Sequence, residues 1–272
     1  MGTPMSRRLL EAGYAVTVYN RSKDKEAPLR AAGAATAESP AALAQQADVV
    51  FLMVSDDQAI HDLFSGPDGL LQASGGGKLF INMSTVSPGI SREMATRSQE
   101  HGHRYLDAPV SGSVKQAETG QLVIMVGGDE AAFAQAQPLF AHLGKLALPL
   151  GATGNGNLAK LAINSLLGVY AQGLAETFLF AQQHGLRAED MHEIVANSAL
   201  GNVFSKIKGE AILADNYQAA FALKLLAKDL RLARAEGLST PLAETVHQTF
   251  QQAQPALGDE DVIAIIKHLP RH

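Results

Sequence analysis

The sequence contains no cysteine in its 272 residues. Disulfide bonds, thiolate nucleophiles and cysteine metal sites are therefore excluded. The absence fits a reducing compartment, and we expect a cytoplasmic protein. The 9 histidines are scattered, and only His101 and His103 lie close together in the sequence. No group has the spacing of metal ligands, so we predict no metal site.

The sequence also lacks a broad excess of basic residues and a long uninterrupted apolar run. Its formal net charge is -5 at pH 7, which argues against nucleic acid or an anionic membrane as the main partner. The most apolar long segment, residues 158–181, carries Lys160, Asn164, Gln172 and Glu176. We therefore expect no membrane-spanning helix.

The chain does have the material for a large core, since 46% of its residues are hydrophobic, and its length suggests two domains. Up to about residue 150, short β-rich runs alternate with amphipathic helical stretches, which is typical of a doubly wound parallel sheet. Beyond Gly151 only helical patterns occur. We predict an α/β, Rossmann-like domain over residues 1–151 and an all-α domain over residues 152–272 that begins with a long interdomain helix.

The elements expected in these two domains follow from the same patterns. The expected strands are residues 15–20, 48–55, 78–84, 104–108, 122–126 and 145–149. The later helices are residues 158–184, 190–199, 204–213, 222–236 and 241–252.

The first residues have the pattern of a helix N-terminus. In a dinucleotide-binding βαβ unit, a first strand leads into a glycine-rich turn, and the following helix points its N-terminus at the pyrophosphate. Gly2 stands where the third glycine of that turn would be. A first strand and two further glycines would precede it, so the predicted sheet is N-terminally incomplete. A single glycine beside a methionine is a weak signal on its own.

The turn after the expected strand 15–20 bears on the choice of cofactor. An acidic residue about twenty residues beyond the glycine turn binds the ribose 2′-hydroxyl of NAD. Asn20, Arg21 and Ser22 stand at this place instead. A guanidinium beside a hydroxyl suits a 2′-phosphate, so we predict NADP, with NAD as the alternative. The competing interpretation is a solvated turn that binds no cofactor.

Two loops end expected strands with small residues. Residues 107–112 include Ser111 and Gly112, whose hydroxyl and backbone N–H groups suit a carboxylate. Ligands of an open α/β sheet bind outside the carboxyl ends of the strands, where this loop is expected. Residues 82–85 end the preceding strand similarly. A plain strand-ending turn is the alternative for either loop.

A glycine-rich turn at residues 151–156 opens the long apolar helix. Lys160 and Asn164 are four residues apart, so they lie one turn apart on the same face. Burial would lower the pKa of the lysine ammonium toward the range of a general acid or base, and Asn164 would orient the reacting oxygen. The alternative is a solvated surface lysine. Lys228 and Asp229 form a second candidate pair, for which a surface charge pair is the alternative.

Together and in this order, these segments resemble the motifs of the β-hydroxyacid dehydrogenase family. That family includes 3-hydroxyisobutyrate dehydrogenase and tartronate semialdehyde reductase and is related to 6-phosphogluconate dehydrogenase. Residues 107–112 resemble its substrate-binding loop, residues 154–164 the start of its catalytic helix, and residues 228–229 its C-terminal active-site pair. The resemblance covers essentially the whole chain. It implies a Rossmann-like domain joined by a long helix to a helical domain, in homodimers or homotetramers.

The resemblance also implies roles for individual residues. Lys160 would be the general acid/base, and Asn164 would help to place the substrate. Ser111 and Gly112 would bind the substrate carboxylate, while Lys228 would lie beside the substrate and the nicotinamide. The residues implied to bind the cofactor are Gly2, Asn20, Arg21, Ser22, Met53, Val54, Thr85 and Lys228.

The sequence departs from the family pattern at two places, and each departure leads to an expectation about the protein. Family members begin with a strand and a complete G-x-G-x-x-G, whereas this chain begins at the last Met-Gly, and we expect Met1 to be an internal methionine or the chain to be truncated. We therefore expect the 272-residue form to bind cofactor poorly, which micromolar binding of NADPH in a calorimetric titration would contradict. Ser113 replaces the second of two glycines usual in the family, so the path of its loop can differ.

The predicted reaction is hydride transfer between NADP(H) and a small β-hydroxy acid or its semialdehyde, with Lys160 as general acid/base. Two alternatives stay open. One is a non-catalytic dinucleotide-binding or scaffold module, and the other is an enzyme similar to imine reductases, which usually replace this lysine. The expected partner is a small carboxylate-bearing substrate rather than a nucleic acid or a membrane.

Overall fold

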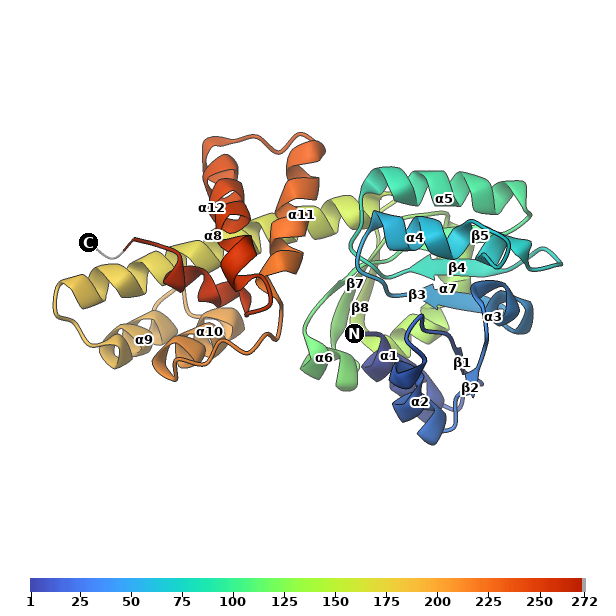
Figure 1. Cartoon of the computed structure of the whole chain (residues 1–272), viewed down its shortest axis with the longest axis horizontal. Helices are drawn as coiled ribbons and strands as arrows, with labels where there is room; N and C mark the ends of the chain where they lie inside the picture. Colours follow the sequence, from blue (N-terminus) through green and yellow to red (C-terminus); the bar gives the residue numbers. More distant parts are fainter. Residues whose placement is uncertain (271–272) are drawn as a thin grey trace. The chain divides into compact units, whose positions relative to one another are not determined.

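The computed structural model describes residues 1–270, which form two compact units. The first unit, Met1–Lys160, is α/β, and the second, which begins at Leu161, is helical (Figure 1). The units meet within one long helix, whereas our predicted domain boundary lies just before that helix. None of the described helices combines the length and the apolar character needed to cross a bilayer.

The first unit alternates strands with helices along the chain. Its strands are β1 (Thr17–Val18), β2 (Ala35–Thr36), β3 (Val49–Leu52), β4 (Leu79–Asn82), β5 (Arg104–Asp107), β6 (Val110–Ser111), β7 (Leu122–Val126) and β8 (Gly144–Pro149). Its α-helices are α1 (Gly2–Glu11), α2 (Ala27–Ala31), α3 (Pro40–Gln46), α4 (Asp57–Phe64), α5 (Pro88–Glu100), α6 (Val114–Glu118) and α7 (Glu130–Leu143).

The strands pair in three sets, and most of the pairs are parallel. Strands β3, β4 and β5 form a parallel sheet in that order, β1 pairs with β2 in parallel, and β7 pairs with β8 in parallel. The short β6 is antiparallel to β7, and a bridge between Asp107 and Gly127 links the ends of β5 and β7. The predicted parallel α/β fold is confirmed. The strands β2 and β6 were not predicted, because runs of two residues carry no hydrophobic period.

Helices cover both faces of the β3–β4–β5 sheet, as a doubly wound fold requires (Figure 1). Alternate residues of β4 point to opposite faces. Leu79 and Ile81 pack with residues of α1 and α7, while Phe80 packs with residues of α4 and α5. Each fully buried side chain of this size contributes about 1.5–3 kcal/mol to folding. The carboxyl ends of these strands are thereby held in a fixed frame.

The second unit is built on α8 (Asn155–Gln183), which starts in the first unit. Its other elements are α9 (Ala188–Asn197), α10 (Val203–Leu213), α11 (Leu223–Ala235), α12 (Pro241–Leu257) and the 3-10 helix η3 (Val262–Lys267). Phe178 and Phe250 are fully buried in its core. A buried ion pair of 2.7 Å between Lys208 and Asp261 joins α10 to the start of η3. The predicted all-helical organisation is therefore confirmed.

Candidate active site

The N-terminus of α8 is fastened to the end of β5 by one carboxylate. Asp107 is fully buried, and its two oxygens accept hydrogen bonds from the backbone N–H of Gly154 at 2.7 Å and of Asn157 at 2.8 Å. Burial raises the pKa of Asp107, and these two hydrogen bonds oppose that rise. A carboxylate also interacts favourably with the positive end of a helix dipole. The two hydrogen bonds to the Asp107 carboxylate thus hold the start of α8 in place.

The side chain of Asn157 makes a second link, toward the end of β4. Its Oδ1 accepts from the N–H of Val86 at 3.0 Å, and its Nδ2 donates to Ser91 Oγ at 3.2 Å. Nearby, Asn82 Nδ2 donates to the hydroxyl of Tyr105 at 2.9 Å. A buried polar frame therefore lies at the carboxyl ends of β4 and β5, where ligands of α/β sheets bind.

Lys160 stands one helical turn beyond this frame. It follows Asn157 by three residues on α8 and so lies on the same side of the helix. Its side chain is half-buried rather than fully solvated. The polar contacts of Asp107 and Asn157 thus set the position of the backbone that carries Lys160.

Asn164, Asp229 and Lys228 form a polar cluster inside the second unit. Asn164 is 2% exposed, and its Nδ2 donates to Asp229 Oδ2 at 2.6 Å. Lys228 Nζ lies 3.1 Å from Asp229 Oδ1, and both side chains are largely buried. The two sequence candidates Asn164 and Lys228 are therefore brought together by a shared carboxylate. The alternative of an exposed charge pair at residues 228–229 is wrong.

The loop with Ser111 and Gly112 has a backbone that requires glycine. Gly112 has φ 137°, and a Cβ there would lie 2.8 Å from Leu122 Cδ2 and 3.0 Å from Gln116 Cβ. Ser113 is the N-cap of α6, and its N–H donates to Gln116 Oε1 at 2.9 Å. Within residues 1–270 no hydrogen bond is formed by the Ser111 hydroxyl, which is half-buried. The loop therefore offers an available hydroxyl at a fixed place.

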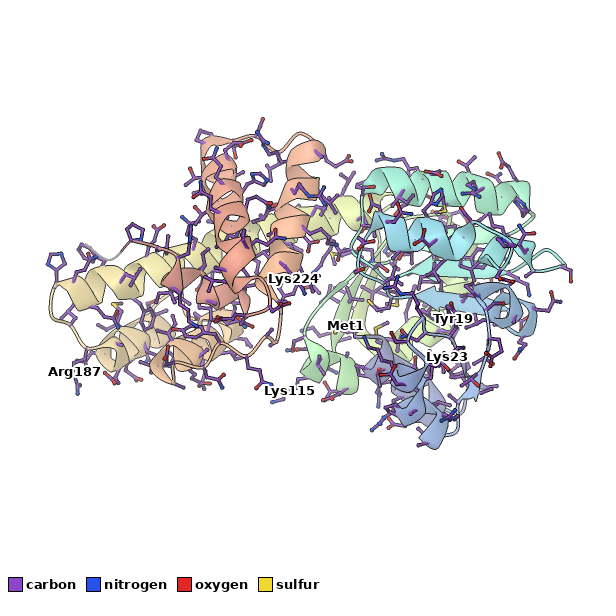
Figure 2. All side chains as sticks on the ribbon, viewed as in Figure 1. Met1, Tyr19, Lys23, Lys115, Arg187 and Lys224 are labelled. Carbon is purple, nitrogen blue, oxygen red and sulfur yellow. The ribbon has the colours of Figure 1, made fainter. Side chains whose placement is uncertain are left out.

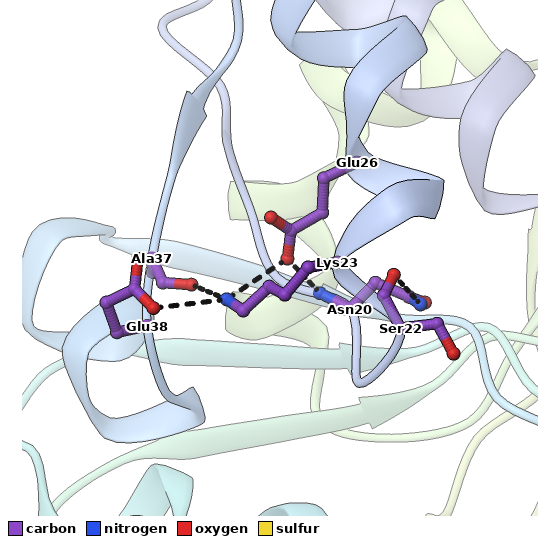
Figure 3. Close-up of polar contacts among 6 residues, drawn as sticks. All are labelled: Asn20, Ser22, Lys23, Glu26, Ala37 and Glu38. Atoms are coloured by element: carbon purple, nitrogen blue, oxygen red, sulfur yellow. Dashed lines mark hydrogen bonds and ion pairs between the residues drawn. The ribbon is translucent and has the colours of Figure 1, made fainter.

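The turn after β1 is stiffened by a buried glutamate (Figure 3). Glu26 is 4% exposed and accepts from the N–H of Asn20 at 2.7 Å and from Lys23 at 3.4 Å. Asn20 Nδ2 donates to the carbonyl of Ser22 at 2.9 Å. Figure 2 labels the neighbouring Tyr19 and Lys23, whose ammonium lies 5.0 Å from the tyrosine ring centroid.

This stiffened turn presents Arg21 to solvent. The side chains of Arg21 and Ser22 are exposed, and in the described part of the chain no ion pair involves Arg21. A guanidinium that is held by a rigid turn and forms no ion pair with a carboxylate can bind an anionic ligand.

The remaining cofactor candidates gather at the ends of β3 and β4. A Cβ on Gly2, the first residue of α1, would lie 3.8 Å from Met53 Cβ, which places the helix N-terminus beside the end of β3. Val54 N–H donates to Ser84 Oγ at 2.9 Å, and Thr85 follows directly. The structure thus brings together Gly2, Met53, Val54 and Thr85, while the Asn20–Ser22 turn follows β1 in the separate β1–β2 pair.

Two residues of these clusters, Asp107 and Asn157, were not predicted as site residues, while Asp229 was expected only as the neighbour of Lys228 in the candidate pair 228–229. Asp107 and Asn157 hold the start of α8, and Asp229 connects Asn164 with Lys228. The sequence marked Asp107 only as the first residue of the loop 107–112, which ends an expected strand. The signal gives no partner, because the partners lie 47 and 50 residues away.

Comparison with known proteins gives the family. Residues 1–155 match the family model described as the NAD binding domain of 6-phosphogluconate dehydrogenase. Residues 154–269 match the model described as NAD-binding of NADP-dependent 3-hydroxyisobutyrate dehydrogenase. The chain belongs to the β-hydroxyacid dehydrogenase family. These proteins are NAD(P)-dependent oxidoreductases, so the predicted family, enzyme class and type of cofactor are confirmed.

Individual relatives of this β-hydroxyacid dehydrogenase cover nearly the whole chain. Glyoxylate/succinic semialdehyde reductase 1 of Arabidopsis thaliana is 36% identical over 98% of this chain and 94% of the relative. A solved structure of 3-hydroxyisobutyrate dehydrogenase from Mycobacterium tuberculosis with L-serine is 31% identical, with a TM-score of 0.86 over 98% of this chain and 94% of that one. The structure of Psf3 with NADP+ and 2-OPP is 26% identical, with a TM-score of 0.92 over 99% of this chain and 97% of that one.

Proposed function

We propose that this β-hydroxyacid dehydrogenase interconverts a small carboxylate-bearing hydroxy acid and its semialdehyde, with Lys160 as the general acid/base and NADP(H) as the preferred cofactor. The observation that carries the proposal is the buried frame of Asp107 and Asn157, which fixes the helix turn that bears Lys160. A catalytic group must be held within hydrogen-bonding reach of the proton that it transfers. The buried, hydrogen-bonded Asp107 and Asn157 support Lys160 in this way, because they hold the helical turn that carries it.

The residues of the chain fit a nicotinamide dinucleotide. The N-terminus of α1 carries Gly2 beside the end of β3, which suits a pyrophosphate. Arg21 and Ser22 on the stiffened turn suit a 2′-phosphate, which favours NADP over NAD. When bound, the cofactor supplies the hydride to the substrate carbon or accepts it.

The residues of the protein supply the proton and orient the substrate. In reduction, the Lys160 ammonium donates a proton to the substrate oxygen, which becomes the hydroxyl, and in oxidation the neutral amine takes that proton back. Ser111 and the backbone N–H of Gly112 bind the substrate carboxylate and so fix the carbonyl for attack. Asn164, fixed by Asp229, places the reacting oxygen, and Lys228 adds a positive charge for an anionic substrate.

The proposal is tested by following NADPH oxidation with a panel of small aldehydes. The panel pairs each semialdehyde, such as succinic semialdehyde, with an uncharged aldehyde of the same length. We expect turnover with the semialdehydes and a much higher KM for the uncharged partners, because a charge-assisted hydrogen bond contributes about 1.5–3 kcal/mol. Equal KM values would overturn the carboxylate site, and no turnover with any member would overturn the proposed function.

We also propose a cytoplasmic location, which fits the absence of cysteine.

A further inference from the structure

The ammonium of Lys23 links the turn after β1 to the end of β2 (Figure 3). It donates to the carbonyl of Ala37 at 2.8 Å, and it lies 3.4 Å from Glu26 Oε1 and 3.6 Å from Glu38 Oε2. Glu26 ends the 3-10 helix η1 (Lys23–Glu26), while Ala37 and Glu38 directly follow β2. We call these four residues the Lys23 clasp: Lys23, Glu26, Ala37 and Glu38. One side chain thus joins the ends of two paired strands.

The two carboxylates of the clasp bear on the binding of a phosphate at Arg21. Glu26 accepts from the N–H of Asn20, the residue before Arg21, so the proposed 2′-phosphate site lies next to a carboxylate. A carboxylate without a counterion would repel the phosphate and compete with it for the guanidinium. Within residues 1–270, both glutamates form their ion pairs with Lys23 alone. Lys23 therefore compensates two negative charges beside this turn.

We propose that Lys23 sets how strongly the Arg21 turn prefers NADP(H) over NAD(H). The inference rests on the proposed binding of the 2′-phosphate by Arg21 and Ser22. Lys23 acts as a positioning residue, because it holds the turn against the end of β2 and keeps the glutamates from Arg21. When Lys23 is removed, the freed carboxylates disfavour the 2′-phosphate, whereas the 2′-hydroxyl of NAD is compatible with an acidic neighbour.

The contacts of Lys23 favour a role in binding over a role in folding. Its side chain is 46% exposed and that of Glu38 is 90% exposed, so their ion pair alone adds little to stability. The Lys23 ammonium nevertheless has a fixed place, since it donates to the Ala37 carbonyl and lies 5.0 Å from the ring centroid of Tyr19, within the range of a cation–π interaction. Its positive charge is therefore kept beside the turn, where an anionic ligand would feel it.

Calorimetric titration with two nucleotides that differ only by the 2′-phosphate tests the inference. We expect the unchanged chain to bind adenosine 2′,5′-bisphosphate more tightly than adenosine 5′-monophosphate. In Lys23→Met this ratio of affinities should fall about tenfold, because a positive charge is lost and two carboxylates are left without a counterion. Adding Glu38→Gln to Lys23→Met should restore part of the ratio, and Lys23→Arg should keep it. A merely structural role would weaken both nucleotides equally and leave the ratio unchanged.

Lys78→Met is the matched control. The Lys78 ammonium also donates to a backbone carbonyl, that of Ala47 at 3.1 Å, but Lys78 precedes β4 and so lies at the amino end of the sheet. This variant should keep the ratio. An unchanged ratio in Lys23→Met, or an equal fall in Lys78→Met, would overturn the role of Lys23. No preference for the bisphosphate in the unchanged chain would overturn the proposed NADP preference as well. Neither nucleotide carries a nicotinamide, so these outcomes are independent of whether the semialdehydes are turned over.

Discussion

Asp107 and Asn157 show how single polar residues can be kept in an apolar interior. Both are fully buried, and both have their oxygens satisfied by backbone N–H groups. Leaving one such group without its partner would cost about 1–3 kcal/mol. The same pattern applies to Glu26, which holds the turn that presents Arg21. At this scale, the proposed preference for NADP depends on one exposed arginine.

Replacing Arg21 should change the choice of cofactor. In Arg21→Ala we expect the Kd for NADPH to rise about 10- to 100-fold, because one or two charge-assisted hydrogen bonds to the 2′-phosphate are lost. The Kd for NADH should change little, and fluorescence titration measures both. Arg30→Ala, at an exposed position on α2, is the control. Equal losses for both cofactors in Arg21→Ala would contradict the assignment.

His103 should make stability depend on pH. It is 4% exposed and its ring packs edge-on against Phe80, with 5.3 Å between centroids. Burial, followed by the charge of Lys78, lowers the pKa of His103 below its ordinary value of 6.5. The folded state thus favours the neutral ring, so this contribution to stability is present above pH 6.5 and is lost as the pH falls below it.

Urea unfolding at about pH 7.5 and about pH 5.5, on either side of the ordinary histidine pKa, checks this effect. We expect the decrease in the free energy of unfolding between these conditions to be smaller in His103→Phe than in the unchanged chain. The same substitution at His61, an exposed residue of α4, serves as the control. An equal decrease in the His103 variant and the unchanged chain would rule out this histidine as a source of the pH dependence.

At the scale of elements, α8 and the β6–α6 loop position the proposed chemistry. The sequence indicated the start of α8 from its glycine-rich turn, and it indicated the loop from its small residues. It did not indicate that β6 pairs antiparallel with β7, or that Asp107 holds the start of α8. These contacts depend on residues far apart in the chain, and local propensity contains no information about them.

Gly112→Ala should destabilise the β6–α6 loop more than an ordinary substitution of a glycine with positive φ. Gly13 has φ 88°, and a Cβ added there would meet nothing within 4 Å, whereas at Gly112 the added Cβ makes close contacts with Leu122 and Gln116. An alanine in the left-handed region costs about 1–2 kcal/mol, and a φ of 137° is less favourable still for alanine. The excess in Gly112→Ala over Gly13→Ala therefore measures the clash together with this difference in backbone strain. Comparison of the two urea unfolding curves gives this excess. Equal losses would show that the loop relaxes around the methyl group.

At the scale of the whole molecule, composition and alternating elements were enough to predict an α/β unit followed by a helical unit. The family motifs then gave candidate residues in both units. The clusters around them required the structure, since the Asn164–Asp229 hydrogen bond spans 65 positions. Our central claim is the proposal that Lys160 handles the proton in the hydride-transfer reaction.

The most direct test is turnover by Lys160→Ala with NADPH and a semialdehyde, together with NADPH binding by the same preparation, in a version of the chain extended by the family's first strand and glycine turn. We predict that turnover falls about 10²- to 10⁴-fold while NADPH binding is retained. Lys145→Ala, at an exposed position on β8, should turn over like the unchanged chain. Near-normal turnover by Lys160→Ala would contradict the role of this lysine as the general acid/base.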